Sequence, residues 1–196
     1  DLRADLKGWL RRRRQDAAGW ERRYAEFAFG MPADEHRDAE SVERPARILD
    51  GIPLRGSIDW IEQQGDVLRI TDHKTGKAPA QVPRHTGGGL ILQPLLYALA
   101  AEDLFGKPVK VSRLYYCTQR GGYTAVSVAV TEGARQDVER ALRIIDDGIA
   151  SVCLPAAPSE GQCEWCDYRM VCGPREEERV KRKPPLEPLE RLRSIP

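Results

Sequence analysis

Two short motifs in the middle of the chain carry the residue types best suited to chemistry. Asp59 lies inside the apolar run that starts at Gly56, and Asp72 and Lys74 follow an apolar run that ends at Ile70. A carboxylate in an apolar strand is costly unless it is paired, hydrogen-bonded or bound to a cation. Two neighbouring carboxylates repel each other unless a divalent metal ion, which prefers oxygen ligands, lies between them. Such an ion would bind a scissile phosphate and acidify a water molecule, so the motifs suit phosphodiester hydrolysis.

The elements around these motifs are predicted to bring the two aspartates together. Residues 54–62 and 67–72 alternate as strands do, and Gln63-Gln64-Gly65-Asp66 between them has the composition of a tight turn. A hairpin formed by these strands would place Asp59 and Asp72 in one cleft.

Lys74 is predicted to share a face with Asp72, because residues two apart on a strand point the same way. His73, between them, would direct its side chain to the opposite face. On its own, a D-x-K tripeptide is more often a strand end with a solvated lysine. The hairpin context favours the chemical interpretation, in which Lys74 holds the nucleophile or offsets charge in the transition state.

The remaining pattern predicts helices and strands around this hairpin. Helices are expected over residues 1–24, 90–105 and 131–152, and strands over residues 24–30, 45–49, 109–118 and 123–130. Thr131 is a candidate N-cap of the last helix. Loops are expected over residues 31–43 and around Pro79, Pro83 and Gly87-Gly88-Gly89. We therefore predict an α/β fold with a mixed central β-sheet flanked by helices.

Composition excludes several classes of protein. The 196 residues include 31 Lys+Arg and 30 Asp+Glu, a net charge of +1 that excludes a histone-like polycation. No apolar run approaches the roughly 18–20 residues that span a bilayer, and no charged-then-apolar leader opens the chain, so we expect a cytoplasmic protein without membrane contact. No G-x-x-x-x-G-K-[ST] motif occurs, so no motor is expected in this chain. The start at Asp1 suggests a piece of something longer.

Five cysteines are an odd number, which fits a disulfide framework poorly. Cys163, Cys166 and Cys172 lie together, and this clustering indicates a metal or iron–sulfur centre in a reducing compartment. Zinc is the alternative, although tetrahedral zinc needs four ligands. Cys117 is expected to be a small buried hydrophobe, and Cys153 to have a core or loop role.

The motifs together resemble the PD-(D/E)XK nucleases of the RecB-like branch, over about residues 20–175. Asp59 matches the aspartate of motif II, and Asp72 and Lys74 match the D-x-K motif. Further matching positions are Gln93 and Tyr97 in a Q-x-x-x-Y motif, Glu26 at the acidic position of the first strand, and Cys163, Cys166 and Cys172, which are similar to the iron–sulfur staple of AddB-type nuclease domains.

The resemblance implies a restriction-endonuclease-like core over residues 1–175, followed by a C-terminal tail or linker over residues 176–196. It also implies Mg²⁺ or Mn²⁺ bound by Asp59, Asp72 and the His73 carbonyl, with Lys74 assisting the attacking water. Gln93 and Tyr97 would position the strand, and Glu26 would belong to the site. A 4Fe–4S cluster would take a fourth ligand from upstream of this chain.

The function implied is that of a metal-dependent DNA exonuclease, which acts on single-stranded or duplex ends in recombinational repair and belongs to a larger helicase–nuclease. Two alternatives remain: a catalytically silent nucleic-acid-binding domain and a zinc-stabilised interaction module.

Two individual segments also have alternative interpretations. Residues 90–105 could be an ordinary amphipathic helix with Tyr97 in the core, and the basic run Arg11–Arg14 is more simply a solvated helix face than a phosphate-binding patch.

Overall fold

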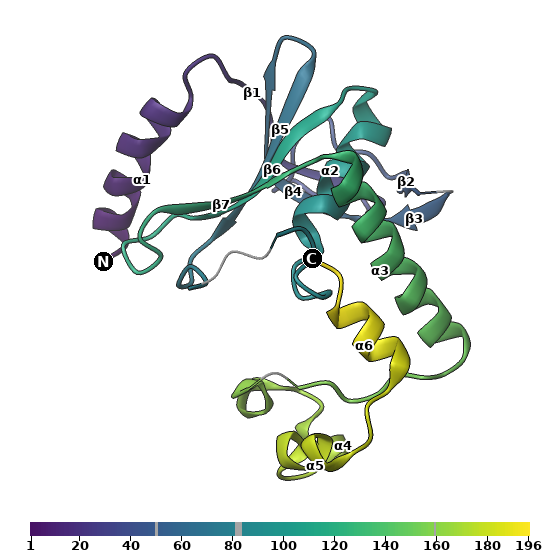
Figure 1. The fold of residues 1–196 in the computed structure, drawn as a ribbon. Coiled ribbons are helices and arrows are strands. Elements are labelled where there is room, and N and C mark those ends of the chain that lie inside the picture. Colours follow the sequence, from purple (N-terminus) through teal and green to yellow (C-terminus); the bar gives the residue numbers. More distant parts are fainter. Residues whose placement is uncertain (50, 81–83, 159) are drawn as a thin grey trace.

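A five-stranded mixed β-sheet forms the centre of the protein (Figure 1). The computed structural model describes residues 1–49, 51–80, 84–158 and 160–196, so Pro83 of the expected loop lies outside the described residues. The strands lie in the order β1 (Glu21–Phe29), β4 (Gly56–Gln64), β5 (Val67–Lys74), β6 (Val109–Tyr116) and β7 (Thr124–Ala129). Neighbours are antiparallel except for β5 and β6, which are parallel. The predicted mixed sheet is confirmed.

Helices cover both faces of this sheet. Figure 1 shows α1 on one side of the sheet and α2 and α3 on the other, with α4 and α5 in a separate lobe. The bounds are α1 (Leu2–Asp16), α2 (Gln93–Phe105), α3 (Glu132–Ala150), the 3₁₀ turn η1 (Gln162–Trp165), α4 (Arg169–Cys172), α5 (Glu176–Arg182) and α6 (Glu187–Arg193); β2 (Ala46–Ile48) pairs with β3 (Ile52–Leu54). Among the described residues, no helix is long and apolar enough to cross a membrane.

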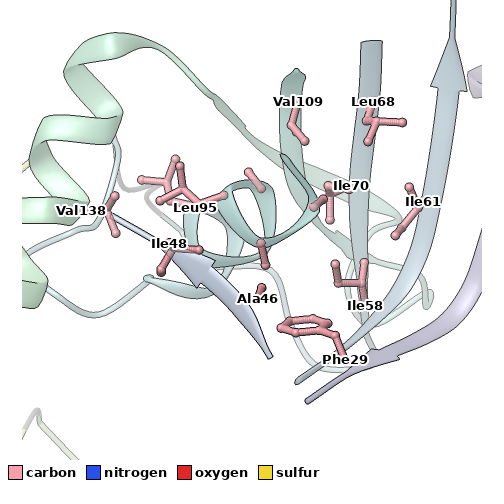
Figure 2. Packing of buried hydrophobic residues seen from close by; sticks show 14 of the residues in the cluster. Phe29, Ala46, Ile48, Ile58, Ile61, Leu68, Ile70, Leu95, Val109 and Val138 are labelled. Carbon is pink, nitrogen blue, oxygen red and sulfur yellow. The ribbon is translucent and has the colours of Figure 1, made fainter. Parts of the chain in front are cut away.

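The hydrophobic core lies between the sheet and α2. Figure 2 shows side chains of β4 and β5 directed toward α2. Residues of β2 and α3 pack at the edges of this cluster. Burial of one such aliphatic or aromatic side chain contributes about 1.5–3 kcal/mol. Members of this cluster with at most 3% exposure are Phe27, Phe29, Ala46, Ile48, Ile58, Ile61, Leu68, Ile70, Leu95, Ala98, Ala100, Ala101, Val109, Val128, Ala134 and Val138.

Local sequence signals explain where α2 begins and ends. Pro94 lies in its first turn, where the missing N–H costs nothing, and Gly106 ends it with a φ of 64°. The expected start at residue 90 is wrong, because the preceding glycine loop keeps its own conformation and leaves Leu90 76% exposed. As the connection between β5 and β6, α2 allows those two strands to be parallel.

The expected helix over residues 1–24 is too long. The structure ends α1 at Asp16, and Gly19 turns the chain with a φ of 77°. Strand β1 begins at Glu21, three residues before the expected start, because pairing with β4 already starts there. Long-range strand pairing therefore overrides the helical pattern of this segment.

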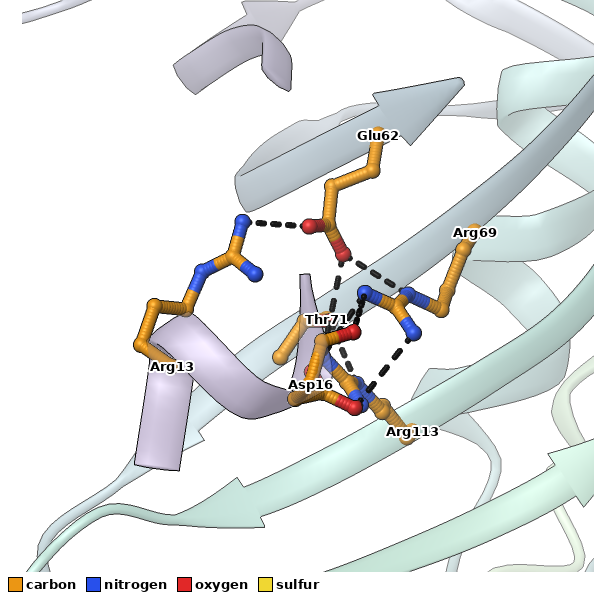
Figure 3. Close-up of polar contacts among 6 residues, drawn as sticks. All are labelled: Arg13, Asp16, Glu62, Arg69, Thr71 and Arg113. Atoms are coloured by element: carbon orange, nitrogen blue, oxygen red, sulfur yellow. Dashed lines mark hydrogen bonds and ion pairs between the residues drawn. The ribbon is translucent and has the colours of Figure 1, made fainter. Parts of the chain in front are cut away.

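A buried cluster of charges joins α1 to the sheet (Figure 3). Glu62 on β4 is fully buried; its carboxylate accepts hydrogen bonds from Arg13 of α1 and, at 2.7 Å, from Arg69 of β5. Arg113 of β6 lies 2.6 Å from the Asp16 carboxylate. Partial burial pushes the pKa of Asp16 upward, but Arg113 and the other two guanidinium groups hold that pKa below its ordinary value. Each charge in the cluster thus has an opposite partner.

The C-terminal segment differs from the expected exposed tail. Ile195 is only 5% exposed, and the carbonyls of Ile195 and Pro196 accept hydrogen bonds from the amides of Gly88 and Thr86, at 2.9 and 2.6 Å. The tail folds back because the glycine loop offers free backbone donors, which require acceptors when buried. The segment therefore covers the loop that leads into α2.

Removal of the Glu62 carboxylate should destabilise the protein strongly. In Glu62→Ala the buried Arg69 would lose its closest counter-charge, at a cost of about 3–5 kcal/mol. The matched control is Glu139→Ala, which removes an i,i+4 pair with Arg143 on α3 worth about 0.2–0.5 kcal/mol. Urea unfolding of both variants measures the difference. Equal, small losses would show that the cluster does not hold α1 in place.

Candidate active site

Asp59 and Asp72 lie where β4 and β5 separate. The antiparallel register runs from Gln64↔Val67 to Trp60↔Thr71, and the two aspartates follow directly beyond that last pair. There the Asp59 carboxylate accepts the backbone N–H of His73 at 2.7 Å. The Asp59 side chain therefore accepts from the His73 N–H, which would otherwise donate to a backbone carbonyl of β4 if the two strands continued to pair. The hairpin expected from the turn sequence brings both acids together.

Glu26 continues the row of acids onto a third strand. The registered pairs on either side of Glu26 place it directly across from Asp59. Its φ of 55° is in the left-handed region, and its carbonyl accepts the N–H of Asp38 at 3.2 Å. Partial burial, together with the carboxylates of Asp59 and Asp72, raises the pKa of Glu26. Three carboxylates thus repel one another across β1, β4 and β5.

Asp72 is held in a triangle with Lys74 and Gln93. Its Oδ1 accepts a hydrogen bond from the Gln93 amide at 2.8 Å, and its Oδ2 lies 2.6 Å from the Lys74 ammonium. The ammonium also donates to Gln93 Oε1 at 2.9 Å. Asp72 is only 6% exposed, and this burial raises its pKa; Asp59 adds to the shift and Lys74 opposes it. The expected placement of Lys74 beside Asp72 agrees with this geometry.

The His73 side chain lies on the other face of the sheet, as its position in the strand predicts. Its ring meets Trp9, Trp60 and Tyr115 edge to face, at centroid distances of 5.8, 6.2 and 6.0 Å. Burial lowers the pKa of His73, so the neutral imidazole is favoured. Trp9 was not predicted as a neighbour of this site, because no local signal in the sequence links α1 to β5.

Tyr97 packs against Phe29 and Gly56. Its ring packs edge to face on Phe29 at 6.4 Å, and a Cβ atom on Gly56 would come within 3.2 Å of it. Among the described residues, no hydrogen bond or ion pair joins Tyr97 to Asp59 or Asp72. The core alternative for Tyr97 thus fits the structure, and Gly56 has a packing role: it gives this ring room.

The acidic row fits a divalent cation in its chemistry. Among the described residues, no three Asp, Glu, His or Cys side chains form a ready-made metal site. However, mutual repulsion among Glu26, Asp59 and Asp72 is what a cation would relieve, and burial makes the charge of Asp72 costly. Mg²⁺ usually binds through one or two carboxylates and retains several waters, so a pair of aspartates is sufficient.

The cysteine cluster lies elsewhere. Cys163, Cys166 and Cys172 line one cavity of about 720 Å³, far along the chain from the acids. Desolvation and the carboxylate of Glu177 raise the pKa of Cys163. All five cysteines are unpaired, and Cys117 is half-buried, where its thiol donates to the Lys74 carbonyl at 3.5 Å. The three clustered thiols share a cavity without being arranged around a common point.

The chain matches one family model and several known proteins. A family model described as the PD-(D/E)XK nuclease superfamily matches residues 2–173. The chain is 27% identical over 127 residues to the Gene 69 protein of Mycobacterium phage D29, and 26% identical over 136 residues to that of phage L5. These matches cover 63% and 67% of this chain but only 44% of each phage protein. A further 66 residues are 33% identical to an ATP-dependent helicase/nuclease subunit from Pelotomaculum thermopropionicum, covering 34% of this chain and 5% of that relative.

Glu26→Gln should stabilise the metal-free protein, and the gain should depend on pH. The folded-state pKa of Glu26 is raised above its ordinary value of 4.5. Below that value Glu26 is protonated in both the folded and the unfolded chain, so it does not reduce the stability of the folded state. As the pH rises through the raised pKa, the folded state loses stability relative to the variant. Urea unfolding between pH 4 and 8 should show that the free energy of unfolding of Glu26→Gln exceeds that of the wild type by an amount that grows with pH and then levels off. A pH-independent difference, or the same gain in the exposed control Glu21→Gln, would contradict the acidic row.

Proposed function

The chain belongs to the PD-(D/E)XK nuclease superfamily, and from this premise we propose that it is the nuclease domain of a metal-dependent DNA exonuclease. The observation that carries the proposal is the row of Glu26, Asp59 and Asp72 with Lys74 2.6 Å from the last acid. We propose residues 1–175 as this domain and residues 176–196 as a C-terminal tail that folds back onto it. The family match over residues 2–173 supports that boundary.

The proposed metal ligands are Asp59, Asp72 and the His73 carbonyl, with Mg²⁺ or Mn²⁺ as the ion. When bound, the ion would act as a Lewis acid on the phosphate and lower the pKa of a water molecule. The His73 N–H points to Asp59, and the next carbonyl, of Lys74, accepts the N–H of Cys117 on the other side of β5. Because the N–H and C=O of one strand residue point to the same neighbouring strand, the His73 carbonyl faces Asp59.

Lys74 and Gln93 would act on the attacking water and the phosphate. Without substrate they satisfy the buried Asp72 carboxylate and each other. With Asp72 engaged by a cation, the ammonium is free to orient the water or offset charge in the transition state. The Gln93 amide would then position the phosphate. For Tyr97 we propose the lesser role of supporting Gln93 from one turn further along α2.

The setting of the activity is also a proposal. Similarity to part of a helicase/nuclease protein supports action on DNA ends beside helicase domains, and hence a role in recombinational repair. Unpaired thiols fit a cytoplasmic location. We also propose that an iron–sulfur cluster, completed by a fourth ligand, would draw together Cys163, Cys166 and Cys172, which line one cavity.

Asp72→Ala should abolish cleavage while the protein stays folded. Loss of a ligand that holds the metal should reduce the rate by more than about a hundredfold, since even outer partners of such ligands are worth about 10–100-fold. The assay uses end-labelled single-stranded and duplex DNA with Mg²⁺ or Mn²⁺. The control is Asp66→Ala in the exposed turn between β4 and β5. Near-normal cleavage by folded Asp72→Ala protein would contradict the assignment. DNA retention without cleavage or metal dependence would favour the silent binding domain.

Lys74→Ala should separate catalysis from metal binding. The lost charge should lower the cleavage rate about 10²–10³-fold. Meanwhile, the rise in melting temperature on addition of Mn²⁺ should persist, because the carboxylates remain. Lys77→Ala, three residues along and exposed, is the charge-matched control. If Lys74→Ala also abolishes the Mn²⁺-dependent rise, the lysine supports the acids rather than the reaction.

A further inference from the structure

A mostly apolar cavity of about 370 Å³ lies between α1 and the sheet. Leu6 and Trp9 line it from α1, Trp60 from β4 and His73 from β5. Both indole rings meet the His73 ring edge to face, so three rings form one continuous wall. The mouth is open to solvent, since Leu6 is 50% exposed and Leu2, also in the lining, is 74% exposed.

The same cavity borders the proposed active site. Glu26 and Asp59 belong to its lining. The Asp59 carboxylate accepts a hydrogen bond from the backbone N–H of His73, which belongs to the aromatic wall. Any ligand that fills the cavity would therefore touch the aromatic wall and the acidic row together.

The lining restricts the chemistry of that ligand. None of the described lining residues is Lys or Arg, and three of them are acidic, so the interior does not suit an anion. The indole rings of Trp9 and Trp60 and the His73 ring form the facing wall. A flat, neutral heteroaromatic group with polar edges fits such a wall, and ligand pockets of about 300–1,000 Å³ are of this size class.

We propose that this cavity holds one unpaired nucleobase of the strand being cut, next to the phosphate that a metal ion held by Asp59 and Asp72 would bind. The proposal rests on the nuclease function proposed above. A base packed against the wall between α1 and the sheet cannot remain stacked and paired in a duplex, so the strand must be single or frayed at this point. Because every base has a π-face, the subsite should accept all four bases.

The test uses single-stranded oligonucleotides that carry one abasic position, moved stepwise from the end. Cleavage is measured with wild-type protein and Mg²⁺ or Mn²⁺, and binding with the Asp72→Ala protein by fluorescence anisotropy. An abasic site at one particular position should lower both kcat/KM and affinity about tenfold, which is the scale of one base–aromatic contact.

Trp9→Ala should weaken binding of the intact strand by a similar factor and remove the penalty at the abasic position. Trp9→Phe should restore both, since it keeps a ring. The control Trp20→Ala should keep the abasic penalty, because that ring lies over Arg69 at 4.5 Å, away from the cavity lining.

Each other outcome overturns one proposal or both. If no abasic position matters, or if Trp9→Ala keeps the penalty, the base subsite is wrong. If Trp9→Ala abolishes self-association in sedimentation while abasic strands behave normally, a second copy of the chain occupies the cavity instead. If base-dependent binding persists but neither metal supports cleavage, the nuclease proposal fails and the subsite stands; absence of both binding and cleavage overturns both.

Discussion

The buried carboxylate of Glu62 is the constraint on which one whole side of the protein depends. It is fully buried on β4, so its charge requires partners, and these come from β5 and α1. The arginines that satisfy it also hold Asp16 at the end of α1. This cluster therefore fixes the helix across the sheet, and the helix in turn brings Trp9 against His73.

The opposite side of the same hairpin depends on burial of apolar side chains. Core packing of α2 against β4 and β5 places Gln93 beside Asp72 and Lys74. The result is a carboxylate whose pKa is raised by burial and by a neighbouring acid, opposed by a single ammonium. A buried carboxylate beside a second acid favours binding of a cation, and this connects the fold to the chemistry of the family. Under the proposed function, stability and activity thus compete at Asp72.

Local signals in the sequence were sufficient for the hairpin and the mixed sheet, because strand alternation and a glycine turn encode them directly. Long-range contacts were not visible. Arg13 lies in a basic run that resembles a solvated helix face, yet it reaches Glu62, 49 residues away, while Arg12 lies over the Tyr123 ring at 3.9 Å. The left-handed turn at Glu26 and the buried Ile195 likewise depend on partners from distant segments, which no local pattern reveals.

The most direct test of the central claim is the location of Mn²⁺ in crystals by anomalous diffraction. We expect a peak in contact with the carboxylates of Asp59 and Asp72 and with the His73 carbonyl, at ligand distances of about 2.0–2.2 Å. The peak should vanish in crystals of Asp59→Asn protein. Absence of the peak at saturating Mn²⁺, or a peak confined to the cavity of the three clustered cysteines, would contradict a metal-dependent nuclease centred on the acidic row.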